Sequence, residues 1–261
     1  MSYSLDFFTT QTILSFVLAM IRFQGFFLLA PIFSRTNIPT VIKIGLSAVF
    51  TFSMYDSIYP LATNLIITKP IYLTVSIFHE LLIGMMLGLL CNLIFDAITT
   101  VTQVAGIQVG MSSSNVFNPS AGGSTNAMGL FYVTVALLFF LSFDGLYHLV
   151  FIIRKSFEII PLASFSVNFA ALAHNYIEVF NQIFVVALKF LLPLIAIMFI
   201  VDVFVALFAK ILPQANMFFL VMPNKIFFGI FVITSILGSF YINLQDFFEN
   251  SMYTFMDQLF R

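Results

Sequence analysis

Tryptophan is absent from this chain of 261 residues, cysteine occurs once, and charged side chains are scarce. Charged residues make up 8% of the sequence, whereas soluble domains contain roughly a quarter. Hydrophobic residues make up 61%, phenylalanine alone occurs 36 times, and the mean hydropathy is +1.08. This composition excludes an ordinary soluble domain and indicates a protein of the membrane or of a large apolar assembly.

An excess of positive charge is also lacking, because ten Lys and Arg stand against eleven Asp and Glu. A net charge of −1 offers no basic surface to a phosphate backbone, so nucleic acid is not an expected partner. The single cysteine, Cys91, cannot form an internal disulfide and lies in an apolar run, which predicts a buried thiol. The first twelve residues carry only Asp6 as a charge, so we expect no cleaved secretory signal.

Long apolar runs are what the sequence has in abundance. A bilayer core about 30 Å thick needs roughly 20 apolar helical residues, and six stretches approach that length. They predict an all-α, integral-membrane-type protein of helical hairpins with about six hydrophobic helices. The expected helices lie near residues 13–33, 38–59, 71–95, 127–153, 176–209 and 217–242.

Prolines predict where these helices end or bend. Three pairs bracket short connections, which favours antiparallel neighbours: Pro31 and Pro39, Pro60 and Pro70, Pro213 and Pro223. The fifth stretch is roughly 50 Å long and contains Pro193, so we expect a kink or break there. Counting Lys and Arg on alternate connections gives equal numbers on the two sides, so the positive-inside rule assigns no orientation. Either the topology is weakly determined, or the helices end in a protein assembly; the tie slightly favours the assembly.

The stretch 99–129 is rich in Gly, Ser and Asn, and no charged residue occurs between Asp96 and Asp144. One interpretation is a re-entrant loop at membrane depth, which is tolerated where protein or a cavity surrounds it. The alternative is a long surface loop, and the composition favours neither. Its glycines permit close backbone approach or positive φ, Asn118 before Pro119 favours a turn, and Met111 and Phe117 offer adaptable apolar contacts.

Isolated charges within the apolar stretches are the other candidate site. Arg22, Glu80, Lys189 and Asp202 should each face protein, water or an opposite charge, because exposure to lipid costs several kcal/mol. They either relay ions in a transporter or pair across helices and fix the register of subunit contacts, and we favour pairing. Asp144 and His148, one turn apart, have the spacing for a shared hydrogen bond. Separately, Gly84 and Gly88 are also one turn apart and predict close packing of another helix.

Enzyme signatures are missing from the sequence. It has no His-Glu-x-x-His, Gly-x-Ser-x-Gly or phosphate-loop motif, and no cysteine pair. His79, His148 and His174 are scattered, so a metal site would need convergence over long distances. We therefore expect a non-catalytic protein without a cofactor or a metal.

Several blocks of residues, in order along nearly the whole chain, resemble the R-type export-gate subunits of bacterial flagella (FliR) and their injectisome counterparts (SctT). The blocks are Arg22, Gly25, Pro31, Pro39 and Lys43; Glu80, Gly84 and Gly88; Gly106, Gln108, Gly110, Asn118 and Pro119; Phe139, Gly145, Ser156, Phe157 and Pro161; and Pro213, Gln214, Asn216, Phe218, Pro223, Lys225 and Gly229. The chain departs from the family at Asp144, where Asn is usual, at Lys210, where Arg is common, and at Val221, where Gly is frequent. Lysine keeps the charge of arginine but lacks its planar fork for a bidentate contact.

The resemblance implies a first part (1–175) similar to the P subunit and a last part (176–261) similar to the Q subunit. It implies assembly with the P and Q subunits (FliP and FliQ), next to the B subunit (FlhB) and the large A protein (FlhA). The assembly would form a conical gate for unfolded substrates in the inner membrane of the flagellar basal body, partly on the periplasmic side and in contact with lipid. The loop at about 106–126 would plug the pore, through Gly106, Gln108, Gly110, Met111, Phe117, Asn118, Pro119, Gly122 and Gly123.

Helix packing and polar contacts between subunits would fall to a second set of residues. For Glu80 we expect a donor or cation from another subunit. The alternatives to a flagellar gate are an injectisome gate, a small-molecule or ion transporter and, least supported, a membrane enzyme. The second set comprises Arg22, Glu80, Gly84, Gly88, Lys189, Asp202, Lys210, Pro213, Gln214 and Asn216.

Overall fold

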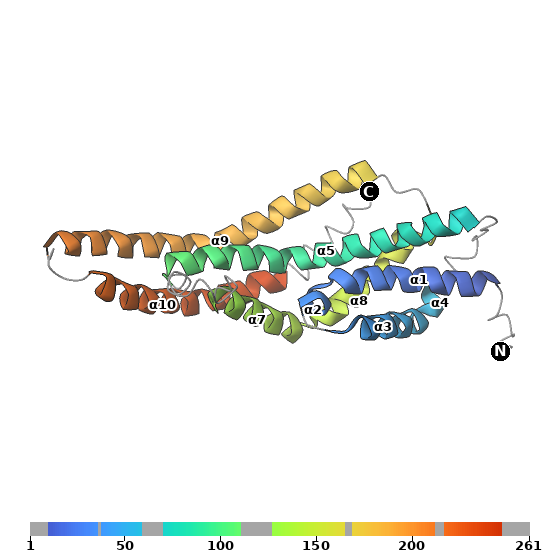
Figure 1. The fold of residues 1–261 in the computed structure, drawn as a ribbon, viewed down its shortest axis with the longest axis horizontal. Coiled ribbons are helices and arrows are strands. Elements are labelled where there is room, and N and C mark those ends of the chain that lie inside the picture. Colours follow the sequence, from blue (N-terminus) through green and yellow to red (C-terminus); the bar gives the residue numbers. More distant parts are fainter. Residues whose placement is uncertain are drawn as a thin grey trace. The chain divides into compact units, whose positions relative to one another are not determined.

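A computed structural model describes residues 10–35, 38–58, 70–110, 127–164, 169–211 and 217–246 (Figure 1). Throughout these ranges the regular elements are α-helices, which confirms the all-α prediction. They are α1 (Thr10–Leu29), α2 (Pro31–Arg35), α3 (Thr40–Ser53), α4 (Tyr55–Ile58), α5 (Pro70–Gln108), α7 (Ala127–Ser142), α8 (Gly145–Ile159), α9 (Phe169–Ile211) and α10 (Met217–Asp246).

The helices form two compact units. The described part of the first unit lies in residues 10–93 and 144–178, and that of the second unit lies in 94–143 and 179–246. The chain passes from one unit to the other inside α5, inside α9, and at the short break between α7 and α8. The units therefore do not coincide with the division at residue 175 that the family resemblance implies, and the P-like and Q-like parts stay a prediction.

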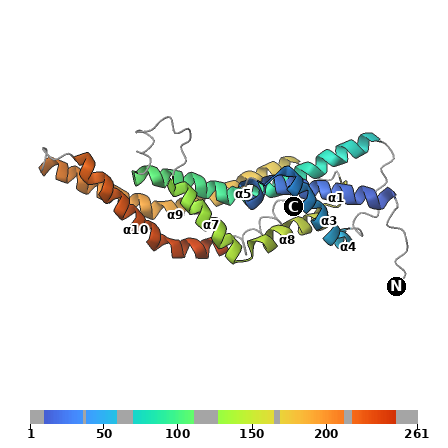
Figure 2. The same ribbon diagram turned by 60° about the horizontal axis from the view of Figure 1, so that its bottom comes forward.

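In the first unit, α1 packs beside α3 (Figures 1 and 2). The rings of Phe23 and Phe27 lie 6.2 and 5.6 Å from the ring of Phe50 on α3, centroid to centroid. Ser47 of α3, which is fully buried, donates a hydrogen bond of 3.2 Å to the side-chain oxygen of Gln24. An apolar stripe with a few internally bonded polar groups thus joins the two helices.

In the second unit, α7 packs on α10 through aromatic side chains. The ring centroids of Phe139 and Tyr241 are 4.9 Å apart, and those of Tyr132 and Phe240 are 6.1 Å apart, both in edge-on geometry. α9 and α10 form the predicted hairpin, since Asp202 and Lys225, each a similar number of residues from the connection, form an ion pair. A cavity of about 30 Å³ with a mostly apolar lining lies among the parts of α5, α7, α9 and α10 that belong to this unit.

The long apolar stretch 127–153 was predicted as one helix, and the structure corrects this. α7 ends at Ser142 and α8 begins at Gly145, because Asp144 adopts the left-handed conformation with φ of 56°. Aspartate is one of the few residues that tolerates this region. α8 accordingly has an amphipathic pattern with an inner face that includes Leu149 and Phe157, unlike the evenly apolar α7.

Two further boundaries differ from the prediction. α5 continues past residue 95 to Gln108 and so includes the first ten residues of the stretch 99–129, which the composition predicts as a loop. The hydroxyls of Thr99, Thr100 and Thr102 bond to carbonyl oxygens four residues earlier, at 2.6, 2.9 and 2.7 Å, so these polar side chains are satisfied within the helix. Pro193 lies inside the continuous helix α9, so the expected break does not occur there, and the alternative expectation of a kink stays a prediction.

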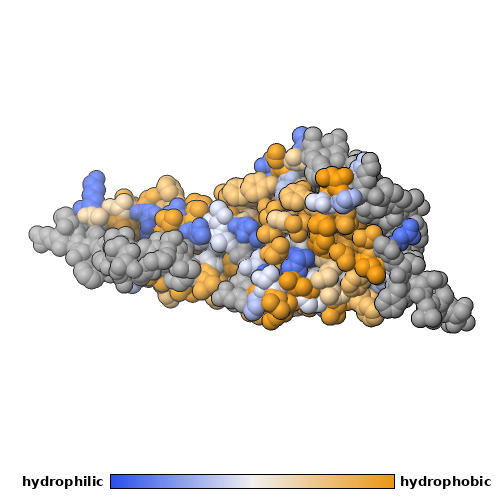
Figure 3. Space-filling model, turned by 45° about the vertical axis from the view of Figure 1, so that its right-hand side comes forward, coloured by the Kyte–Doolittle hydropathy of each residue, from blue (hydrophilic) through white to orange (hydrophobic). Residues whose placement is uncertain are grey.

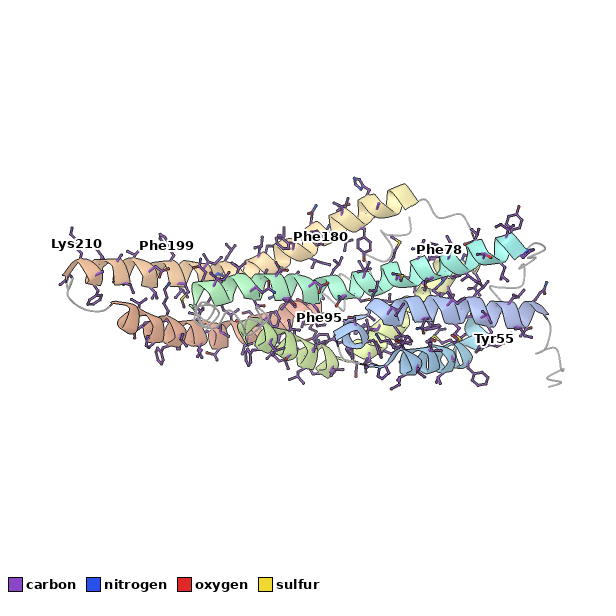
Figure 4. All side chains as sticks on the ribbon, viewed as in Figure 1. Tyr55, Phe78, Phe95, Phe180, Phe199 and Lys210 are labelled. Carbon is purple, nitrogen blue, oxygen red and sulfur yellow. The ribbon has the colours of Figure 1, made fainter. Side chains whose placement is uncertain are left out.

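Four described helices are long and apolar enough to cross a membrane, and the α7–α8 pair would make a fifth if it counts as one broken span. In the span of α9, Leu192–Ile211, only 11% of the residues are buried within the chain. Apolar side chains are exposed over much of the surface (Figure 3), including Phe199, which Figure 4 labels on α9 together with Lys210 at its end. These surfaces require lipid or other protein chains as neighbours.

Candidate functional site

The candidate site is a buried cluster of charged and polar groups in the first unit, formed by α1, α5, α8 and the turn after α8. Arg22 on α1 and Glu80 on α5 lie at its centre, and neither side chain has any exposure. Each is an isolated charge in an apolar helix. Such groups are stable in this setting only when they are paired and their remaining hydrogen-bonding positions are filled.

Arg22 connects three segments of the chain. Its Nε donates to Oε2 of Glu80 at 2.5 Å. Its Nη1 donates to the carbonyl oxygen and the hydroxyl of Ser156 at 3.1 and 3.3 Å, and both Nη1 and Nη2 donate to the carbonyl oxygen of Ile160 at 3.0 Å. The guanidinium carbon lies 4.3 Å from the ring centroid of Phe157. A cation here also stabilises the negative end of the α8 dipole.

The second carboxylate oxygen of Glu80 accepts a hydrogen bond from the turn that follows α8. The amide N–H of Ala163 donates to Oε1 of Glu80 at 2.9 Å. Ala163 has a φ of 57°, and the amide of Ser164 donates to the carbonyl oxygen of Pro161 at 3.2 Å, which closes the turn. One carboxylate therefore bonds to a side chain from early in the sequence and to a backbone amide 83 residues later.

The arrangement fits a structural role. A guanidinium stays protonated in proteins, so Arg22 does not serve as an acid or a base. The described residues contain no group of three His, Cys, Asp or Glu side chains that is suited to a metal ion. Both carboxylate oxygens of Glu80 have partners within the chain, Arg22 and Ala163, and a further donor from another subunit stays a prediction.

Glycines allow α1 and α5 to approach closely beside the ion pair. A Cβ atom on Gly84 would overlap the carbonyl oxygen of Arg22, and one on Gly88 would lie 2.6 Å from the carbonyl oxygen of Phe26. Gly25 on α1 is constrained in the same way, because its Cβ would lie 2.5 Å from the carbonyl oxygen of Leu81. The predicted packing face of Gly84 and Gly88 is thus confirmed.

The remaining predicted charges lie on the second unit. Asp202 on α9 forms an ion pair with Lys225 on α10, so an acid predicted to need a partner has one across the hairpin. Lys189 and Lys210 are exposed on α9. In the first unit, the carbonyl oxygen of Asp144 accepts the backbone amide of His148 at 3.3 Å, at the start of α8.

The predicted loop residues are only partly described. Gly106 and Gln108 lie on the last turns of α5, not in a loop, and Gly110 follows with a φ of 84°, which favours glycine. Nine predicted residues lie outside the described part of the chain: Met111, Phe117, Asn118, Pro119, Gly122, Gly123, Pro213, Gln214 and Asn216.

Sequence reasoning missed part of the buried cluster. Ser156 appeared only in the family pattern, and the carbonyl of Ile160 and the amide of Ala163 have no side-chain signature. Backbone groups at the end of a helix lack partners within it, so the end of α8 could have been searched for a buried cation.

Comparison with known proteins supports the resemblance over most of the chain. The family model described as "Bacterial export proteins, family 1" matches residues 13–251. The flagellar biosynthetic protein FliR of Bacillus subtilis (strain 168) is 29% identical over 250 residues, covering 94% of both chains. FliR of Escherichia coli (strain K12) is 26% identical over 80% of this chain and 78% of its own length. Yop proteins translocation protein T of Yersinia pestis is 25% identical over 82% of both chains.

The matched region includes α1, α5 and α8, which form the buried cluster, and it also includes the α9–α10 hairpin. The apolar helices, their internally paired charges and this match over most of the sequence agree with one another. The chain belongs to the bacterial export proteins, family 1.

Proposed function

We propose that the chain is a non-catalytic structural subunit of the flagellar type III protein export gate in the bacterial inner membrane. The observation that supports this most strongly is the similarity to a flagellar FliR protein along 94% of both chains. The described helices agree with a membrane location, since at least four are long and apolar enough to span a bilayer.

The buried charges favour a structural subunit over a transporter. A transport path needs ionisable groups that face water or a substrate during the cycle. Arg22 and Glu80 have no exposure, and both are hydrogen-bonded within the chain. Asp202 and Lys225 also pair within the chain. In a gate subunit such pairs hold helices in register.

The surface supports a role as one part of a larger assembly. Along α9, the apolar side chains of Phe199, Phe204 and Phe208 are 67%, 58% and 57% exposed. In the proposed gate, helices of the P and Q subunits cover such surfaces, with the B subunit and the large A protein adjacent and lipid around the rest. Unfolded export substrates then pass through the assembled conduit.

The loop that the sequence predicts at about residues 106–126 is the proposed plug of that conduit. A closed gate must stop ions and still yield to an extended polypeptide, so its plug should lack charge and contain adaptable side chains. Residues 111–126 contain no charged side chain and include Met111 and Phe117. Gly110, with its positive φ, is where the chain leaves α5 towards this loop.

The second candidate is a subunit of an injectisome export gate. It is favoured by the similarity to the Yop translocation protein, at 25% identity over 82% of both chains. The higher identity and coverage of the Bacillus subtilis FliR favour the flagellar assignment.

Deletion of the gene in its native bacterium tests the assignment. The flagellar proposal predicts cells without external filaments, with swimming restored by a plasmid copy. Normal filaments together with the loss of a secreted virulence protein would instead support the injectisome. Normal swimming and secretion in the deletion strain would contradict both.

A further inference from the structure

The turn after α8 contains a strained residue that is held by one carboxylate. Ala163 adopts a φ of 57°, a region that residues with a Cβ atom rarely occupy. Alanine has no polar side chain with which to stabilise this conformation locally. Such strain persists where the surroundings over-determine the backbone, and here the Ala163 amide donates to the fully buried Glu80 at 2.9 Å.

A second contact ties the following helix to α5. The hydroxyl of Tyr176 on α9 donates to the carbonyl oxygen of Met86 on α5 at 3.0 Å. Burial raises the pKa of this phenol, so it stays protonated and remains a donor. Glu80 and Met86 are roughly 9 Å apart along α5 by the helical rise. α5 therefore holds the chain at two points, one before α9 begins and one within its first turns.

We propose that Glu80 is a positioning residue, which through the amide of Ala163 sets the direction in which the chain leaves α8 and so fixes where α9 starts. The inference rests on the proposed function in one respect: partner helices of the gate would need the start of α9 in its correct place. Arg22 contributes by holding Ser156 and Ile160 at the end of α8, just before the turn.

The ordinary alternative is that Glu80 does no more than neutralise Arg22. The two roles are separable because the two carboxylate oxygens have different partners. In an Arg22→Met background the charge to be neutralised is gone. Glu80→Gln then keeps an oxygen acceptor for the Ala163 amide, and Glu80→Leu keeps none, while the sizes of the side chains stay similar.

The two roles of Glu80 predict opposite rankings of the Gln and Leu double variants in deuterium exchange and in swimming. If Glu80 positions the turn, deuterium exchange in peptides covering residues 157–164 should be no faster in Arg22→Met with Glu80→Gln than in Arg22→Met alone. With Glu80→Leu, exchange there should accelerate about tenfold or more, while peptides of α3 stay unchanged, and swimming should be weaker than with Gln. If Glu80 only neutralises Arg22, leucine should perform as well as Gln or better, because the buried amide N–H₂ would need a new partner. That order would overturn the proposal.

Single substitutions at Ala163 test the conformation of the turn with the ion pair intact, and they remain available if neither double variant accumulates. Ala163→Gly keeps the N–H and removes the steric cost of positive φ, so swimming and exchange should match the parent chain. Ala163→Val keeps the N–H but disfavours positive φ, so exchange in residues 157–164 should rise and swimming should fall. Equal behaviour of the Gly and Val variants would contradict the proposal. The exchange measurement does not depend on export, so it separates this inference from the assignment as a gate subunit.

Discussion

Arg22 and Glu80 are 58 positions apart in the sequence, and Nε of the arginine lies 2.5 Å from Oε2 of the glutamate where neither side chain is exposed. This contact joins α1 to α5, and the other bonds of the pair extend to the end of α8. Three segments that are distant in the sequence therefore depend on one buried cluster.

Removing one partner of this pair should be far more damaging than removing both. Arg22→Met or Glu80→Leu alone leaves a buried charge uncompensated, which costs about 3–5 kcal/mol. The double variant replaces both charges by apolar side chains and should recover part of that loss. The amount of protein in membranes and its resistance to thermal aggregation in detergent measure this. A double variant weaker than either single variant would contradict the prediction.

Gly84→Ala should destabilise the first unit by about 1–3 kcal/mol, because the new methyl group would overlap the backbone oxygen of Arg22 and force α1 away from α5. Gly45→Ala on α3 is the matched control, since nothing lies within 4 Å of its added Cβ. That control should stabilise its helix by roughly 0.5–1 kcal/mol. Thermal aggregation of the two variants in detergent would show the difference, and equal midpoints would speak against tight α1–α5 packing.

The ion pair between Asp202 and Lys225 should respond to an exchange of charges. Asp202→Lys alone places two cations together on the α9–α10 hairpin and should reduce swimming and membrane levels. Lys225→Asp in the same chain restores an opposite pair and should recover most of both. If the exchanged pair behaves no better than the single variant, another group supplies the partner of one of these residues in the assembly.

Cys91 has no exposure in the folded chain. A membrane-permeant maleimide should therefore leave it unlabelled in native membranes and label it after denaturation. Ser142→Cys, at an exposed position on α7, is the positive control and should react in native membranes when no partner covers it. Rapid labelling of the parent chain in native membranes would contradict the burial of α5.

Deletion of residues 111–124 tests the proposed plug. The shortened chain should still assemble, since the buried cluster, the α1–α5 contact and the α7–α10 contact do not include these residues. It should, however, make the membrane permeable to small ions. Ion flux in cells that express the shortened or the full chain measures this. Unchanged permeability with normal assembly would exclude a plug in this segment.

The sequence allowed the helical class, the buried cysteine and the close-packing glycines to be predicted, because each depends on local composition or spacing. It also indicated that Arg22, Glu80 and Asp202 need partners. It did not identify the partners, because the pairs join helices whose packing is not determined by local pattern. The backbone groups of Ile160 and Ala163 were invisible for a stronger reason, since every residue except proline has the same amide and carbonyl.

Two boundary errors have specific physical causes. The apolar composition of residues 127–153 continues through the break at Asp144, and only the Asp144–Gly145 dipeptide signals a turn there. The Gly, Ser and Asn content of the stretch 99–129 suggested a loop from residue 99 onward, yet the threonine hydroxyls near residue 100 bond to the preceding turn and allow α5 to continue. In both places one conformational detail outweighed the average composition of the stretch.

The most direct test of the central claim is the identity of the proteins that remain bound to this chain. A tagged copy expressed from its own locus, extracted in mild detergent and analysed by mass spectrometry, should bring P and Q export-gate subunits with it in a stable complex. A monomer or homodimer free of both subunits, isolated from cells in which they are present, would contradict the assignment as a gate subunit.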